Sequence, residues 1–246
     1  RALGSPPVTI LDYEGVELGA FIKSGTTLLH PEVVPAACFT DRGFPEARLF
    51  SFPGLKEDIA FSGIDLTESV VVRLPSPRDE SRLGVLVRPP SQTSHYRVDR
   101  SMKVLEKLLD NLATQDRLQV IFSPREQSQI ELLDSRHWHI TPVVLEDAIP
   151  MVSLLRQVDY VITGGGTMLR EAAWFGVPGS TLFQGQMPAV DEWLENQGAI
   201  DRLTIESDMN IFPRMDFDAE RKPVEHHPEA LEHVIKRIVQ IGAGEI

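Results

Sequence analysis

The chain has few of the residues and runs that would tie it to an oxidising compartment or to a membrane. Its one cysteine, Cys38, cannot form an internal disulfide, which indicates a reducing, cytoplasmic setting. No run of about 18 apolar residues is present, so the sequence predicts no membrane span. A charged-then-apolar leader is also missing from the start of the chain, which begins at Arg1.

Basic residues are scarce as well. The 246 residues include 24 Lys and Arg against 36 Asp and Glu, a formal net charge of −12. This charge argues against broad binding to nucleic acid or to an anionic membrane, although it permits a local basic pocket for a phosphate. Histidines 226 and 227, beside Glu225 and Glu229, lack a second ligand group at zinc spacing, so we expect no metal site.

The order of apolar segments predicts the fold class. Three strand-like runs at 6–14, 26–35 and 47–57 precede a polar, proline-bearing stretch at 62–82. Beyond it, we expect strands at 83–89, 117–124, 138–144, 158–163 and 178–183, and helices at 99–113, 125–135, 146–157, 166–177, 189–199 and 228–242. This alternation predicts an α/β protein with a doubly wound parallel sheet, which binds ligands at the carboxyl ends of its strands. We place a boundary near residue 80, with domains at 1–80 and 81–246.

The clearest local signal is the stretch "VDYVITGGGTMLREAAWFGVP" at 158–178. An apolar strand is followed by Gly164, Gly165 and Gly166, and a helix is expected to begin near Thr167. The first N–H groups of a helix have no intrahelical acceptor and carry partial positive charge, so an anion is favoured there. Thr167 can cap the helix, and Glu171, one turn further on, can accept hydrogen bonds from ribose hydroxyls. The alternative is that the glycines form only a tight turn and that Glu171 lies on a solvent-exposed helix face.

Arginines follow two other expected strands. Arg88 ends the run at 83–89, and Arg125 follows the run at 117–124. A guanidinium at either place can bind a phosphate through two parallel hydrogen bonds, although a surface ion pair is the alternative. His95, next to Tyr96, is a candidate for proton transfer or a hydrogen-bonded structural histidine.

Several motifs carry a resemblance to a known family. They are "LDYE" at 11–14, "PGLKED" at 53–58, "VRPP" at 87–90 with "SHY" at 94–96, "PREQ" at 124–127, "GGGTMLREAA" at 164–173 and "AVDEWL" at 189–194. In this order they resemble the domain-of-unknown-function-354 family. That family is similar to glycosyltransferases of the GT-B fold and to UDP-N-acetylglucosamine 2-epimerases, which pair two Rossmann-like domains.

The resemblance implies a role for each motif. A nucleotide-diphosphate sugar, with a UDP-sugar as the expected donor, would place its diphosphate at Gly164–Thr167 and its ribose at Glu171. Arg88, Arg125 and His95 would face the same site, and no metal would be obligatory. Two departures affect the N-terminal half: its first strand–helix–strand portion is missing, so this domain is expected to be incomplete, and "GAFIKSGTTLLHP" differs from the usual family wording.

Three functions remain open at this point. The first is a glycosyltransferase of the GT-B type, and the second is an epimerase acting on a UDP-sugar. The second would need carboxylates in the N-terminal half, where Asp12 and Glu14 are the available pair. The third is a protein that binds a nucleotide-sugar without turnover, in keeping with the missing portion.

Overall fold

A computed structural model describes residues 7–64, 72–77, 79–91, 99–212 and 222–245. The chain folds into two compact units. Unit 1 comprises residues 1–64, 188–193 and 225–246, and unit 2 comprises residues 65–187 and 194–224. No helix within the described ranges is both long and apolar enough to cross a membrane.

Unit 1 contains a three-stranded parallel sheet in the order β1-β2-β3. The strands are β1 (Val8–Ile10), β2 (Thr27–Pro31) and β3 (Leu49–Phe52). The helices of this unit are α1 (Gly19–Ser24), α2 (Ala37–Thr40), α3 (Lys56–Ala60) and α9 (Ala230–Ala243), with a short 3₁₀ turn, η1 (Glu46–Arg48). Sequence patterning indicates the three strands but not α1 or α2, which are too short for a clear helical period.

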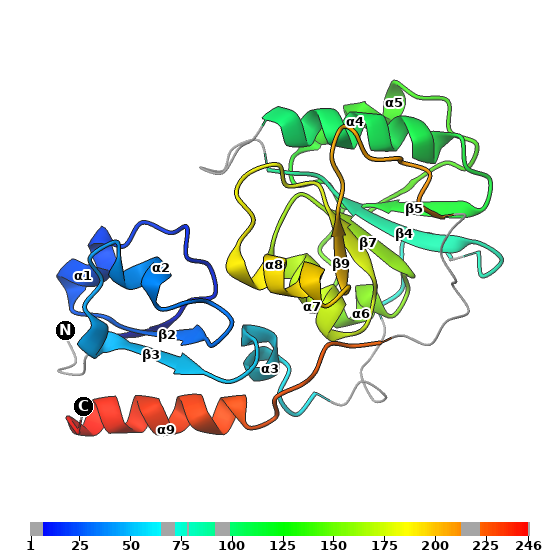
Figure 1. Ribbon diagram of the computed structural model, residues 1–246. Coiled ribbons are helices and arrows are strands. Elements are labelled where there is room, and N and C mark those ends of the chain that lie inside the picture. Colours follow the sequence, from blue (N-terminus) through cyan, green and yellow to red (C-terminus); the bar gives the residue numbers. More distant parts are fainter. Residues whose placement is uncertain (1–6, 65–71, 78, 92–98, 213–221, 246) are drawn as a thin grey trace. The chain divides into compact units, whose positions relative to one another are not determined.

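Helix α9 packs on the sheet of unit 1, against β3 and α3 (Figure 1). Its Ala230 and Val234 are buried in one cluster with Leu29 and Phe52. We expected this closing helix to belong to the domain at 81–246, together with a boundary near residue 80. The first unit instead ends at residue 64 and takes residues 225–246 as well, because the apolar side of α9 is buried on β3.

Unit 2 contains a six-stranded parallel sheet in the order β6-β5-β4-β7-β8-β9. The strands are β4 (Leu83–Arg88), β5 (Leu118–Phe122), β6 (Val143–Val144), β7 (Tyr160–Thr163), β8 (Gly179–Thr181) and β9 (Ile200–Arg202). The helices are α4 (Asp99–Ala113), α5 (Glu131–Asp134), α6 (Met151–Leu155), α7 (Thr167–Trp174) and α8 (Ala189–Asn196), with the 3₁₀ turn η2 (Gln127–Gln129). Helix α8 begins among the residues of unit 1 and ends among those of unit 2.

The helices of unit 2 cover both faces of its sheet, as a doubly wound fold requires. Helix α4 lies on one face and α7 on the other (Figure 1). Residues Val104, Leu105, Leu108, Leu109 and Leu112 of α4 are buried against side chains of β4, β5 and β7. The expected helix at 99–113 is therefore confirmed, because its apolar residues recur at the helical period and face the sheet.

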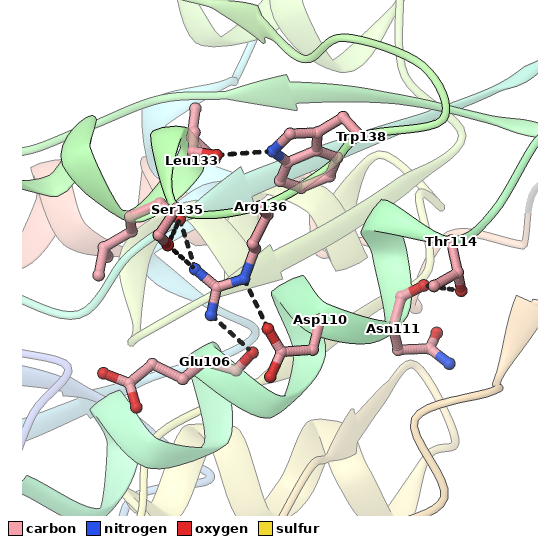
Figure 2. A network of polar contacts seen from close by, with 9 residues as sticks. Glu106, Asp110, Asn111, Thr114, Leu133, Ser135, Arg136 and Trp138 are labelled. Carbon is pink, nitrogen blue, oxygen red and sulfur yellow. Dashed lines mark hydrogen bonds and ion pairs between the residues drawn. The ribbon is translucent and has the colours of Figure 1, made fainter.

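The segment after β5 departs from the sequence expectation. The helix expected at 125–135 is divided into η2 and α5, and the strand expected at 138–144 is reduced to Val143–Val144. Figure 2 shows two contacts of this segment with neighbouring helices. The Nε of Arg136 lies 2.7 Å from the Oδ1 of Asp110 in α4, and Trp138 donates from Nε1 to the carbonyl of Leu133 in α5 at 2.9 Å. Because Arg136 and Trp138 are bonded to these helices, the backbone near residue 138 does not pair with the sheet, and β6 begins at Val143.

The strand order reverses beside β4, which fixes where a ligand can bind. β4 pairs with β5 on one side and with β7 on the other. Arg88 at the end of β4 pairs in register with Thr163 at the end of β7. In open α/β sheets, the connections on the two sides of such a reversal diverge and leave room for a ligand at the carboxyl ends of the strands. The glycine loop and Arg125 lie at this end of the sheet.

Candidate functional site

The glycine loop joins β7 directly to α7. Strand β7 ends at Thr163, and the N–H of Gly164 donates to the Arg88 carbonyl at 3.1 Å, which joins the loop to β4. Helix α7 begins at Thr167, as the sequence predicts, but its N-cap is Gly166 and no side chain caps it. Thr167 is therefore the first helical residue and not the cap. Its exposed hydroxyl remains at the start of the helix.

The first N–H groups of α7 are available to an anion. Within the described part of the chain, the N–H groups of Gly166, Thr167 and Met168 have no hydrogen-bond acceptor, whereas those of Leu169 and Arg170 donate to the Gly166 carbonyl. Such groups at a helix start carry partial positive charge. An anion placed beside them would meet several donors that the fold has already oriented.

The three glycines differ in what surrounds them. A Cβ at Gly164 would lie 2.3 Å from the Cα of Pro90, so packing alone requires glycine there. At Gly165 and Gly166, a Cβ would meet no atom within 4 Å. The tight turn therefore accounts for Gly164 through packing and for Gly165 through its backbone φ of +159°. Gly165 and Gly166 also leave open space beside the free N–H groups, as close approach of a ligand to the backbone requires.

Arg88 and Arg125 bring two positive charges to the same end of the sheet. Arg88, half-buried at the end of β4, donates from Nη1 to the Ser123 hydroxyl at 2.9 Å. Arg125 follows β5, and its partly buried Nε donates to the Pro89 carbonyl at 3.0 Å. Each guanidinium therefore has one N–H group fixed by a neutral acceptor. The other N–H groups have no partner among the residues that the structure describes.

The positive charges of Arg88 and Arg125 repel each other. Burial lowers the pKa of Arg88, and burial followed by the charge of Arg88 lowers the pKa of Arg125. Neither arginine forms an ion pair with a described carboxylate, so the surface ion pair that the sequence left open is not present among these residues. Two guanidiniums without a compensating carboxylate favour an anion that carries more than one negative charge.

Glu171 lies in the second turn of α7 and is half-buried. It follows Thr167 by four residues, so the two side chains share one side of the helix. Glu171 therefore lies one helical turn beyond the free N–H groups at the start of α7.

The two acidic candidates of unit 1 have different surroundings. Asp12 forms an ion pair with Lys56, whose Nζ lies 2.5 Å from Oδ2. Glu14 accepts the N–H of Ala189 at 2.8 Å through Oε1, at the first residue of α8. Its Oε2 is buried and has no hydrogen-bond partner in the described residues. Glu14 thus caps a helix from a distant part of the sequence, a role that its position in "LDYE" does not reveal.

The histidine candidates differ in whether the structure describes them. His95 and Tyr96 lie outside the described residues. His227 bonds through Nδ1 to the Oε1 of Glu229 at 3.0 Å, and this hydrogen bond raises the pKa of His227. Across the described ranges, no group of three or more His, Cys, Asp and Glu residues is arranged to hold a metal ion.

Sequence reasoning missed two residues that support the arginines. Ser123 accepts the Arg88 hydrogen bond, and the buried Gln129 accepts the N–H of Arg125 at 2.8 Å. The available signal was the polar run "SPREQSQ" directly after the buried strand β5. Polar residues that follow a buried strand face the end of the sheet where ligands bind.

The chain has two parallel α/β units, one with a glycine loop at its point of strand reversal, and its fold is GT-B-like. The chain belongs to the family described as "Protein of unknown function (DUF354)", whose model matches residues 5–239. It is also 28% identical over 203 residues to the uncharacterized protein MJ0665 of Methanocaldococcus jannaschii. That match includes 78% of this chain and 55% of the relative, so the chain spans about half of the curated relative's length.

Solved structures agree on the fold. The UDP-GlcNAc 2-epimerase of Neisseria meningitidis bound to UDP-GlcNAc matches 96% of this chain and 70% of its own, with 12% identity and a TM-score of 0.63. The Methanocaldococcus jannaschii UDP-GlcNAc 2-epimerase in complex with UDP-GlcNAc and UDP matches 94% and 75%, with 11% identity and a TM-score of 0.61. The Anabaena protein Alr3699/HepE in complex with UDP-glucose matches 97% and 70%, with 13% identity and a TM-score of 0.51. At these identities, the likeness establishes the fold.

Proposed function

We propose that this protein binds a nucleoside diphosphate sugar, with its diphosphate at the loop Gly164–Thr167. The observation that carries the proposal is the pair of guanidiniums of Arg88 and Arg125, which have no carboxylate partner in the described residues. Their remaining N–H groups and the unpaired N–H groups at the start of α7 are suited to the non-bridging oxygens of a diphosphate. Structural neighbours with bound UDP-GlcNAc, UDP or UDP-glucose support this class of ligand.

Glu171 is proposed to bind the ribose of the same ligand. A carboxylate has acceptor oxygens only, and two adjacent ribose hydroxyls can donate to both of them. Glu171 lies one helical turn beyond Thr167, which is the direction in which a nucleoside can extend from a diphosphate held at the helix start. A free phosphate or pyrophosphate would not use this residue, so its contribution should depend on the nucleoside.

As an enzyme, the protein is proposed to transfer the sugar with departure of the nucleoside diphosphate. Cleavage of the bond between the sugar and the diphosphate leaves negative charge on the departing oxygen. The Arg88 and Arg125 guanidiniums and the loop N–H groups are placed to stabilise that charge, so no metal ion is obligatory in this proposal. Asp12, Glu14 and His95 remain candidates for proton transfer, with Asp12 already paired to Lys56.

Epimerisation of a UDP-sugar is the second candidate, since several structural neighbours are UDP-GlcNAc 2-epimerases. Glu14 is the residue that favours it, because its Oε2 is buried and has no hydrogen-bond partner among the described residues. Binding of a nucleotide-sugar without turnover is the third candidate.

Calorimetric titration tests the binding proposal directly. UDP, UDP-N-acetylglucosamine and UDP-glucose are titrated in parallel with the guanosine and thymidine diphosphate sugars. We expect saturable binding of at least one of them, and no binding of any would overturn the proposal. Product analysis of the bound mixture then separates the candidates. Release of nucleoside diphosphate in the presence of an acceptor indicates transfer, a changed sugar without an acceptor indicates epimerisation, and unchanged ligand indicates a binding protein.

A further inference from the structure

Gln129 is an uncharged side chain buried at the base of the proposed anion site. It is the last residue of η2 and has 0% of its surface exposed. Its Oε1 accepts the backbone N–H of Arg125 at 2.8 Å, and its Nε2 donates to the Pro90 carbonyl at 2.8 Å. A buried amide is costly unless its polar atoms are hydrogen-bonded, and here both ends of the amide are.

The two partners of Gln129 lie in different loops. Arg125 follows β5, whereas Pro90 follows β4. Pro90 is also the residue whose backbone would lie 2.3 Å from a Cβ at Gly164, in the loop after β7. The side chain of Gln129 therefore links the loop after β5, which carries Arg125, to the turn at Pro90. The glycine loop packs against that same turn.

The guanidinium of Arg125 depends on the same turn. Its Nε donates to the carbonyl of Pro89, the residue before Pro90. Gln129 thus fixes both ends of this side chain, holding the Arg125 backbone directly and the Pro89 acceptor through the neighbouring peptide. With Nε engaged, the planar guanidinium keeps one orientation and presents its Nη groups.

We propose that Gln129 is a positioning residue for the anion site, which holds Arg125 and the Pro89–Pro90 turn in the arrangement that receives a diphosphate. The inference rests on the proposed function of this site. Donors that are already oriented before binding require less ordering of side chains when the anion arrives, so their contribution to affinity is larger. A residue that only supported the fold would change the free energy of unfolding and leave the affinity of the folded protein unaltered.

The test compares Gln129→Leu, Arg125→Lys and the double variant with the wild type. Calorimetry with UDP and with inorganic pyrophosphate gives the affinities, and thermal unfolding establishes that each protein is folded at the titration temperature. We expect Gln129→Leu to weaken both ligands by about tenfold, the scale for impairing hydrogen bonds to a charged group. Arg125→Lys should weaken binding in the wild type but have little further effect beside Gln129→Leu, because the orientation that distinguishes Arg from Lys is already lost.

Gln129→Glu provides a second variant if Gln129→Leu does not fold. It keeps an acceptor for the Arg125 N–H, places an oxygen against the Pro90 carbonyl, and adds a negative charge that competes with the ligand for Arg125. We expect weaker binding here too. Full affinity in a folded Gln129 variant, with an undiminished Arg125→Lys effect, would overturn the role of Gln129 and leave the proposed function intact. Absence of binding by the wild type would overturn both.

Discussion

Pro90 and Gly164 approach each other so closely that there is no room for a side chain at residue 164. A Cβ there would lie 2.3 Å from the Cα and 2.5 Å from the N of Pro90. The contact joins the loop that follows β4 to the loop that follows β7, on the two sides of the strand reversal. The close contact between Pro90 and Gly164 fixes the separation of these two loops. Both loops border the proposed diphosphate site.

Substitution of Gly164 should therefore reduce stability more than substitution of its neighbour. Gly164→Ala is expected to lower the free energy of unfolding by about 1–3 kcal/mol, because the new methyl group must displace the Pro90 backbone. Gly165→Ala should cost less, because a Cβ there meets no atom within 4 Å and only the backbone φ of +159° is unfavourable for a side chain. Urea unfolding of both variants measures the difference. Gly165→Val should instead abolish nucleotide binding while the fold persists, and nucleotide affinity equal to wild type in that variant would contradict the loop assignment.

The arginine pair should determine affinity for diphosphates. Arg88→Ala and Arg125→Ala are each expected to weaken UDP binding by about 1.5–3 kcal/mol, the range for hydrogen bonds to charged groups. Lysine at either position should recover part of the loss, because it restores the charge but not the two parallel donors. Calorimetry at low and moderate salt measures both effects. Arg117→Ala is the control, since this exposed arginine precedes β5 at the opposite end of the same strand; an equal loss there would indicate a general effect of charge.

Glu171 should distinguish a nucleoside from a bare diphosphate. Glu171→Ala is expected to weaken UDP binding by about 1–3 kcal/mol and to leave pyrophosphate binding unchanged, because only the nucleoside offers ribose hydroxyls. The measurement is a pair of titrations of the same variant. Thermal unfolding serves as the control for the fold. UDP affinity that is unaltered in Glu171→Ala would remove this residue from the site.

Glu14 should stabilise the start of α8. Its Oε1 accepts the Ala189 N–H at 2.8 Å, so Glu14→Ala leaves a helix N–H without its acceptor. We expect the free energy of unfolding to fall by about 0.5–2 kcal/mol, as for the loss of an N-cap. Glu14→Gln should cost less because its amide oxygen can still accept. Chemical denaturation compares both variants with Glu46→Ala, an exposed carboxylate in η1 that should have almost no effect.

His30 should make stability depend on pH. Burial of this side chain, beside the Phe39 ring, lowers its pKa below the ordinary value of 6.5, although the hydrogen bond to the Pro31 carbonyl acts in the opposite direction. The unfolded chain then binds more protons than the folded chain as pH falls below about 6.5, so folding stability decreases on acidification. His30→Gln should flatten this part of the curve of unfolding free energy against pH. Equal slopes for the two proteins between pH 6.5 and the folded pKa would contradict the assignment.

The raised pKa of His227 has the opposite sign and supplies a control for that measurement. Its hydrogen bond to Glu229 contributes stability below the unfolded value of 6.5 and loses it as pH rises through the folded pKa. His227→Gln should therefore remove the fall in stability as pH rises above 6.5 and leave the acid loss attributed to His30, below 6.5, unchanged. The contribution is small because Glu229 is exposed to solvent and water screens the interaction.

Hydrophobic periodicity predicted the elements whose conformation depends mainly on their own local sequence. The helix at 99–113 has the bounds expected from sequence because its leucines recur at the helical period. The period does not say which sheet an apolar helix face will cover, so α9 was expected in the C-terminal domain, whereas it packs in unit 1. Strand β6 is shorter than expected because Arg136 and Trp138 bind to neighbouring helices.

The site shows the same division. The glycines, Thr167, Arg88 and Arg125 could be selected from their places after apolar runs, since strand ends share one edge of a parallel sheet. Ser123 and Gln129 could not, because they act through hydrogen bonds to Arg88 and Pro90, which lie 35 and 39 residues away in the sequence. The buried state of Gln129 is likewise a result of tertiary packing that no local pattern encodes.

The packing of α9 also sets an order of assembly during synthesis. The sheet of unit 1 is complete by residue 52, yet Leu29 and Phe52 are covered by Ala230 and Val234. Strands β1 to β3 therefore emerge from the ribosome before α9, which covers them. The strands and helices of unit 2 are synthesised between the two. Until α9 has been synthesised, the apolar side chains of strands β1 to β3 that it covers stay exposed to water and to chaperones that bind such surfaces.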